Sequence, residues 1–178
     1  GACGVHDREE RLPLPPLPLL VRLKFSVVLR CRVGVSWPAP SKPWPWSTTL
    51  SLAAANLLVG NKAGDAVLEA VFMGPELEFT SDAMVAVTGA EMPPKVDGVE
   101  QAGWTAFAVK KGQVLSFGFL KAGARAYIAV SGGIDVPVKL GSRSTYTLGA
   151  LGGHEGRALK AGDSLPLGKG AGGKGAMP

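Results

Sequence analysis

Cysteine and histidine are scarce in this chain, which has only two of each among its 178 residues. Cys3 and Cys31 both lie in the N-terminal segment, and His6 is far in sequence from His154. Such a set builds no disulfide framework and no zinc site with the usual ligand spacing. We therefore expect no metal centre, and the low cysteine content suits a reducing compartment.

Long apolar runs are also lacking. No stretch of about 18 apolar residues is free of charge, so the sequence predicts no transmembrane helix. The segment Leu12–Leu29 is apolar, but it contains Arg22, Lys24 and four prolines and has no secretory cleavage site. We expect a cytoplasmic protein without a membrane partner. An organellar transit peptide stays open as an alternative, because residues 11–61 contain no Asp or Glu.

The middle of the chain lacks the excess of positive charge that nucleic-acid binding needs. The formal net charge is +5. The surplus of Lys and Arg lies before Ser47 and after Leu167, and the residues between are nearly balanced. Proteins that bind nucleic acid gather basic side chains on the folded domain. We therefore expect no nucleic-acid partner.

Glycine and proline are abundant, with 25 and 14 residues, which is typical of short strands joined by turns. Three segments differ in composition: a proline-rich, atypical segment 1–46, a domain over 47–168, and a Gly/Lys-rich tail over 169–178. Dense proline blocks helices and sheet ladders. Residues 1–46 are thus either a proline-rich ligand for another module or an unstructured or mispredicted leader, with one strand candidate at 25–35.

Local patterns in the domain predict a helix followed by strands. Residues 47–59 begin with Ser and Thr and are followed by Gly60 and Asn61, which are start and stop signals of a helix. Its apolar positions at helical spacing are Leu50, Ala53, Ala54 and Leu57. The strand candidates are 66–73, 76–80, 84–88, 104–109, 113–117 and 124–130. Short strands at this spacing predict a mostly β fold, an antiparallel barrel or sandwich, with one or two short helices.

One short pattern occurs twice. Residues 109–118 and 159–168 both read apolar, Lys, any residue, Gly, two residues, Leu, any residue, apolar, Gly. The first glycine of each copy stands where a tight turn needs positive φ. We interpret the two copies as hairpins of one barrel, related by pseudo-symmetry.

The densest candidate chemistry lies between residues 124 and 157. Three hydroxyls neighbour Arg143, those of Ser142, Ser144 and Thr145. A planar guanidinium among hydroxyls could grip a carboxylate, a bicarbonate-like group or a ureido carbonyl. The alternative is a turn that its own Ser and Thr satisfy, with Arg143 on the surface.

Four further residues of this region are candidates. Gly132 and Gly133 allow the backbone N–H groups to approach an anion closely. Asp135 could orient a substrate N–H or act as a base, or it could cap a turn. His154 could titrate near neutral pH, or it could be a surface hydrogen-bonding residue.

Several of these runs resemble a known family. The runs are Asn56–Asn61, Leu68–Glu69, Gly74–Pro75, Val87–Ala90, Gly132–Pro137, Leu140–Gly149, Gly152–His154 and Gly156–Arg157. They are similar to the subdomain shared by urea carboxylase, allophanate hydrolase subunit 2 and one of the 5-oxoprolinase subunits, and the later runs resemble urea carboxylase most. The resemblance implies a cyclophilin-like antiparallel β-barrel.

The resemblance also implies a reaction, the transfer of a carboxyl group from carboxybiotin to urea to give allophanate. From their residue types, Arg143 and the backbone N–H groups near Gly132 and Gly133 are the candidates for stabilising the developing charge, and Asp135 would hold an amide-like N–H of urea or biotin. The substrate-binding candidates are Gly132, Gly133, Ser142, Ser144, Thr145 and His154. The sequence has no biotin-acceptor motif of the Ala-Met-Lys-Met type. Biotin and ATP are therefore expected to come through partner biotin carrier and biotin carboxylase domains.

The family domain extends beyond both ends of the resembling region. It continues past the equivalent of Gly168, and its glycine-rich entry is replaced here over residues 34–44. We therefore expect residues 47–168 to be the N-terminal part of such a domain, inactive alone. Two alternatives stay open: a 5-oxoprolinase-like subunit that hydrolyses a lactam with ATP and partner subunits, and a non-catalytic truncated binding module.

Overall fold

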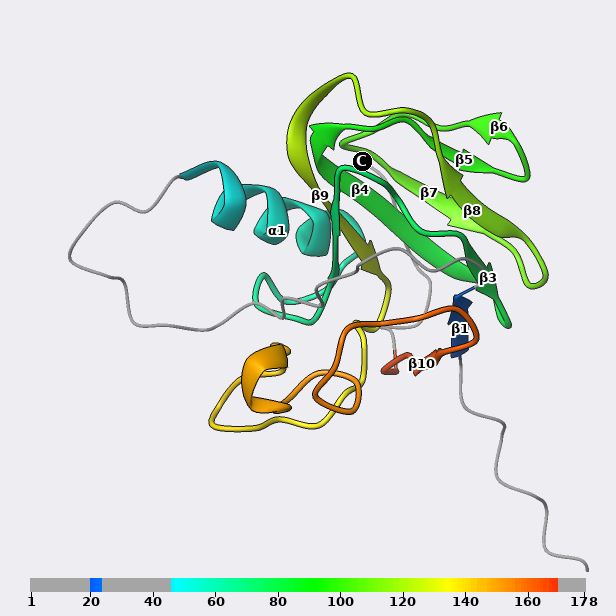
Figure 1. The fold of residues 1–178 in the computed structure, drawn as a ribbon. Coiled ribbons are helices and arrows are strands. Elements are labelled where there is room, and N and C mark those ends of the chain that lie inside the picture. Colours follow the sequence, from blue (N-terminus) through cyan, green and yellow to red (C-terminus); the bar gives the residue numbers. More distant parts are fainter. Residues whose placement is uncertain (1–19, 24–45, 170–178) are drawn as a thin grey trace, which may run out of the picture.

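The computed structural model describes residues 20–23 and 46–169. This part of the chain forms two antiparallel sheets, one α-helix and a short 3-10 turn (Figure 1). The expected mostly β, antiparallel fold is confirmed. The strand candidate at 25–35 and most of the proline-rich segment lie outside the described residues. No helix in the described ranges has the length and apolar character needed to cross a membrane.

The smaller sheet has the strand order β2-β9-β4-β7. Its strands are β2 (Leu68–Val71), β4 (Ala83–Glu91), β7 (Ala106–Val109) and β9 (Ala122–Val130). The central strands β4 and β9 are apolar on both faces because each face is covered. Val85 and Ile128 belong to the core between the sheets, whereas Tyr127 and Ala129 pack with Ala55 of the helix.

The larger sheet has the order β10-β1-β3-β8-β5-β6. Its strands are β1 (Leu20–Leu23), β3 (Leu77–Phe79), β5 (Pro94–Val96), β6 (Val99–Glu100), β8 (Val114–Phe117) and β10 (Ser164–Pro166). Leu77 and Leu115, paired across β3 and β8, share the main core cluster with Val85 of the other sheet. The two sheets therefore enclose one apolar core.

Helix α1 (Trp46–Leu58) lies against β4 and β9, but with the opposite face from the one its apolar spacing suggests. Leu50 and Leu57 are both 63% exposed, whereas Ser51 and Asn56 are buried. The reason is polar: the hydroxyl of Thr88 on β4 donates to the Ser51 carbonyl at 2.6 Å. The face of α1 that meets the sheet carries Ser51, Asn56 and Ala55 together with the partly buried Leu52, and not Leu50 or Leu57.

The repeated pattern builds the same turn twice, yet neither copy is a hairpin. Lys110 N–H donates to the side chain of Gln113 at 2.8 Å, and Lys160 N–H donates to the side chain of Asp163 at 2.8 Å. Gly112 and its counterpart at 162 both have positive φ, 86° and 89°. The hairpin interpretation is wrong, because β7 pairs with β4 and β8 pairs with β3 and β5. The first turn is a corner between the two sheets.

Candidate functional site

The segment that follows β9 is fixed to the end of α1 by two asparagines. The Oδ1 of Asn61 accepts the N–H of Gly132 at 2.8 Å, and its Nδ2 donates to the Val130 carbonyl at 2.9 Å. The same Nδ2 donates to Oδ1 of Asn56 at 3.1 Å, and Asn56 donates to the Asp65 carbonyl at 2.8 Å. These bonds satisfy buried polar groups and hold the start of the candidate site against the sheet.

The glycine pair expected to face an anion uses its N–H groups inside the fold. Gly132 donates to Asn61, and Gly133 donates to the Val130 carbonyl at 2.9 Å. Their φ angles are 92° and 70°, a region that favours glycine. In this conformation the pair shapes the turn after β9, and its N–H groups are already engaged.

Asp135 and Arg143 lie together, as an ion pair with 2.8 Å between Oδ1 and Nη1. The same Nη1 donates to the Val136 carbonyl, and the N–H of Asp135 donates to the Pro166 carbonyl at 2.8 Å. The pair is thereby fixed beside β10. Among the described residues, Nε and Nη2 of Arg143 have no hydrogen-bond partner. They can donate to a carbonyl or carboxylate oxygen, while Asp135 can accept an N–H.

The three hydroxyls around Arg143 have different surroundings. Ser142 Oγ accepts the N–H of Ser144 at 3.0 Å, which is the local turn bond that the alternative interpretation predicted. Lys139 and Ser142 also exchange two backbone hydrogen bonds, of 2.7 and 3.0 Å. Thr145 Oγ1 is buried without a hydrogen-bond partner. The Thr145 hydroxyl therefore has unused hydrogen-bonding capacity inside the fold.

A glycine-rich turn packs against Thr145. A Cβ on Gly153 would lie 1.8 Å from Thr145 Oγ1, and a Cβ on Gly152 would lie 2.1 Å from the Ser144 carbonyl oxygen. Both glycines have positive φ. Residues 144–145 and 152–153 can therefore approach this closely only because the turn has no side chains at these two positions.

Gly153→Ala is expected to lower the free energy of unfolding by about 2 kcal/mol, of which roughly 1 kcal/mol is the left-handed conformation and the rest is displacement of Thr145. Urea denaturation measures the loss. Gly141→Ala is the control, since Gly141 has φ +73° with open space around it and reports conformational strain alone. Equal losses in both variants would contradict close packing at Gly153.

His154 lies next to Asp163 and not next to the Asp135–Arg143 pair. Its Nε2 is 3.8 Å from Oδ1 of Asp163, which Arg157 holds through two hydrogen bonds of 2.7 and 2.8 Å. The Arg157 guanidinium lowers the pKa of the buried Asp163 carboxyl to about 2, with the Lys160 N–H assisting. His154 therefore borders an ion pair that stays charged at neutral pH and closes the turn before β10.

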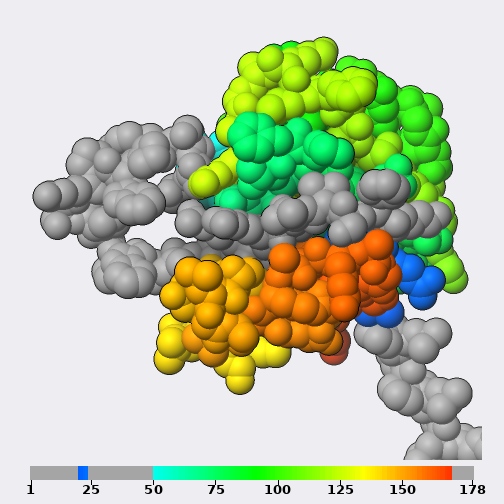
Figure 2. All heavy atoms as spheres, viewed as in Figure 1, coloured from blue at the N-terminus to red at the C-terminus, as the bar shows by residue number. Residues whose placement is uncertain are grey.

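The sequence-predicted residues thus fall into two neighbouring groups. Asp135 and Arg143 form one, and Thr145 with Gly153 and His154 belongs to the other. The segment that carries both, coloured yellow to orange, forms part of the molecular surface (Figure 2). Asp163 was not among the predicted residues. Its position in the repeated pattern, equivalent to that of Gln113, could have indicated its role in the turn. The first group alone places an N–H acceptor, Asp135, beside the unused guanidinium donors of Arg143.

Comparison with known proteins identifies the family. The model of the carboxyltransferase domain, subdomain A and B, matches residues 48–177. Urea amidolyase of Saccharomyces cerevisiae is 42% identical over 136 residues, which are 76% of this chain and 7% of that protein. A 5-oxoprolinase subunit of Escherichia coli is 45% identical over 121 residues, which are 67% of this chain and 38% of that protein.

The solved urea carboxylase of Kluyveromyces lactis has the same fold, with a TM-score of 0.73 and 34% identity. The alignment covers 84% of this chain and 14% of that structure. This chain therefore spans well under half the length of these relatives. The sequence match over most of the domain and the shared fold lead to one conclusion: the chain belongs to the carboxyltransferase domain family, subdomain A and B.

Proposed function

We propose that residues 47–168 are part of a carboxyltransferase domain that transfers a carboxyl group from carboxybiotin to urea, giving allophanate. The observation that supports this function best is the Asp135–Arg143 pair, which places an N–H acceptor beside unused guanidinium donors. Urea has both N–H groups and a carbonyl, so it complements the pair. We propose that the protein works in the cytoplasm and depends on partner domains for activity.

The donor set fits the ureido and carboxylate groups of carboxybiotin. Nε and Nη2 of Arg143 can hold a carboxylate or ureido oxygen, because a guanidinium presents its donors in a planar fork. Carboxybiotin, when bound, supplies the carboxyl group. Biotin carrier and biotin carboxylase partners would deliver it, with ATP used only in those partners.

Each residue of the proposed site has a separate task. Asp135 accepts an N–H of urea and orients the nitrogen, and Arg143 stabilises negative charge as it develops on oxygen. Ser142 and Ser144, next to Arg143 in sequence, border the substrate, whereas Thr145 and His154 belong to the turn beside it. Gly132 and Gly133 position the turn that carries Asp135.

A chimera tests the proposal. Residues 48–168 would replace the matched segment of yeast urea amidolyase, so that the other domains are present. Formation of allophanate from urea is measured. A folded chimera without carboxyl transfer to urea would contradict the proposed function.

Within that chimera, Arg143→Ala is expected to lower kcat about thirtyfold, corresponding to about 2 kcal/mol of transition-state stabilisation. The loss is moderate because Nη1 is already engaged by Asp135. Lys139→Ala is the control, an exposed basic residue of the same loop, and its rate should match the parent. An unchanged rate in Arg143→Ala would remove Arg143 from the mechanism.

A second function is supported by the 45% identity to the 5-oxoprolinase subunit of E. coli. There the chain would take part in ATP-dependent hydrolysis of a lactam with partner subunits. The same segment placed in the E. coli protein, with its partners, tests this by the release of glutamate. Activity in the E. coli chimera alone would favour the second function. Absence of activity in both the yeast and the E. coli chimeras would favour a non-catalytic binding module.

A further inference from the structure

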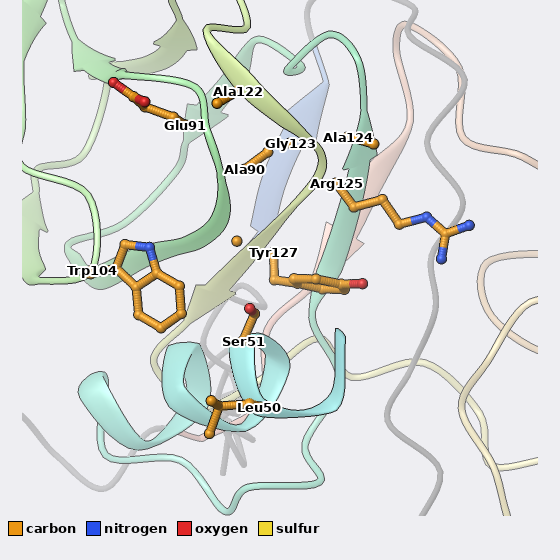
Figure 3. Close-up of a pocket in the computed structure, with 11 residues that line it drawn as sticks. Leu50, Ser51, Ala90, Glu91, Trp104, Ala122, Gly123, Ala124, Arg125 and Tyr127 are labelled. Atoms are coloured by element: carbon orange, nitrogen blue, oxygen red, sulfur yellow. The ribbon is translucent and has the colours of Figure 1, made fainter. Parts of the chain in front are cut away.

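A cavity of about 750 Å³ opens where α1 begins, at the far ends of β4 and β9 from the loop site described above. Leu50 and Ser51 of α1 border it, with Trp104 and Arg125 toward opposite ends and Tyr127 between them (Figure 3). None of the residues proposed for carboxyl transfer lines it. The fold thus holds a second concave surface that the proposed reaction leaves unused.

The cavity exists because two strands are bent beside it. The ladder between β4 and β9 shifts register between Gly89 and Glu91, and Gly89 has φ +93°. A Cβ on Gly89 would lie 2.4 Å from the Arg125 carbonyl oxygen, so a side chain cannot be placed there. A bulge of this kind redirects the side chains that follow it, and bulges are common next to binding sites.

Trp104, at one end of the cavity, has an unusual backbone conformation. Its φ is +59°, and its backbone N–H donates to the Val87 carbonyl at 2.8 Å. A bulky residue rarely adopts positive φ, and such residues cluster at functional sites. With the exposed Leu50 nearby, Trp104 gives this end of the cavity an apolar wall.

At the other end, Arg125 faces a buried carboxylate. Glu69 on β2 is opposite Tyr127 in the ladder, on the sheet face that α1 covers, and is 1% exposed. Neither of its carboxylate oxygens accepts a hydrogen bond. The Arg125 Nε lies 3.8 Å from Oε1, close enough for an ion pair but too far for a hydrogen bond.

This ion pair decides what charge a ligand can carry. Glu69 already offsets the positive charge of Arg125, and Lys121 lies 4.0 Å from the Glu91 carboxylate that also lines the cavity, so the two ion pairs carry no net charge. An anion would lose its hydration without meeting net positive charge, whereas a neutral carbonyl still gains the donors of the guanidinium. Arg125 is 42% exposed at its side chain, and its guanidinium makes no hydrogen bond within the described residues.

We propose that this cavity binds a neutral amide or ureide that bears an apolar group. The carbonyl oxygen accepts from Arg125, and the apolar group lies against Leu50 and Trp104. Glu69 is a positioning residue, because it holds the guanidinium without touching the ligand. The site shares no residue with the Asp135–Arg143 pair, so the inference stands independently of carboxyl transfer.

Three probes of similar size test the proposal by NMR titration of the full chain. Benzylurea and N-benzylacetamide carry a neutral carbonyl, and phenylacetate carries a carboxylate. Both neutral probes are expected to shift the N–H signals of Gly89, Gly123 and Arg125, with phenylacetate binding at least tenfold more weakly. Stronger binding of phenylacetate, no binding, or shifts confined to residues 132–157 would overturn the proposal.

Two variants locate the contacts. Arg125→Met keeps an unbranched apolar stem and removes the guanidinium donors, so the affinity for benzylurea should fall about tenfold. Lys62→Met, at an exposed position outside the cavity, is the matched control and should bind as the parent does. Equal affinity in Arg125→Met and the parent would overturn the contact with Arg125.

Glu69→Gln separates positioning from simple structural support. The resonance of the Arg125 Nε–H should move in the free protein, and benzylurea should bind severalfold more weakly while the fold is retained. An Nε–H resonance that is unchanged by Glu69→Gln would overturn the positioning role. Failure of the carboxyltransfer chimera leaves these binding results unaffected, so the two proposals fail separately.

Discussion

Asn56→Ala is expected to lower the free energy of unfolding by about 3 kcal/mol, because it removes a buried amide that joins three parts of the chain. Asn56 has no exposed surface. Its Nδ2 donates to the Asp65 carbonyl at 2.8 Å, and its Oδ1 accepts from Asn61 at 3.1 Å. Alanine removes both of these hydrogen bonds of a buried side chain and leaves a small cavity.

Urea denaturation of parent and variant measures this loss. The midpoint should fall while the m-value stays constant, because the surface exposed on unfolding is unchanged. Leu57→Ala is the control on the same helix. It removes more side chain, yet Leu57 is mostly exposed and its change should stay within about 0.5 kcal/mol. A loss below about 1 kcal/mol in Asn56→Ala would contradict the importance of the amide.

The same variant should also loosen the candidate site. Asn61 bridges Asn56 and the N–H of Gly132, so its side chain loses one of its anchors. Hydrogen exchange at Gly132 is expected to accelerate, whereas exchange at Val85 in the core should change only with global stability. Equal acceleration at both positions would show that the effect is global and not local to the turn after β9.

Much of the fold could be predicted from local pattern. Ser and Thr before an apolar segment, followed by Gly60 and Asn61, predicted α1 correctly, and apolar runs that end at glycine predicted β4 and β9. The buried face of α1 could not be predicted, because it depends on Thr88 reaching the Ser51 carbonyl across 37 residues. Strand β5 was missed because it begins at Pro94, which pattern reasoning treats as a breaker.

Long-range pairing limited the prediction of the sites. The composition around Arg143 indicated a candidate, but its contact with Asp135 depends on how the loop folds back. The sequence did not predict that Glu69 and Arg125 form a pair, because only the β2–β9 register brings them to one face. The repeated pattern correctly predicted the same turn in both copies, because a turn is determined by residues close in sequence. Whether that turn joins neighbours in one sheet depends on pairing with β3 and β4, which the pattern does not contain.

Asp163→Asn is expected to cost about 3 kcal/mol of stability at pH 7, and the cost should shrink by about 2 kcal/mol between pH 4 and pH 2. Asp163 is nearly buried and receives two hydrogen bonds from Arg157 and one from the Lys160 N–H. Arg157 is partly exposed, so water moderates the loss that a fully buried pair would show.

The direction of the pH dependence follows from the pKa of Asp163. The ion pair lowers that pKa from 3.8 to about 2, so the folded state favours the ionised carboxyl. The stabilisation is complete above the unfolded pKa and is lost as the pH falls through the folded pKa of about 2, below which both states are protonated. Asparagine cannot ionise, so the variant lacks this contribution at every pH and the two stability curves converge in acid.

Urea denaturation at pH 7, 4 and 2 measures the difference, with Glu76→Gln as an exposed carboxylate control. A difference that is constant across this range would mean that Asp163 acts through shape and not through its charge.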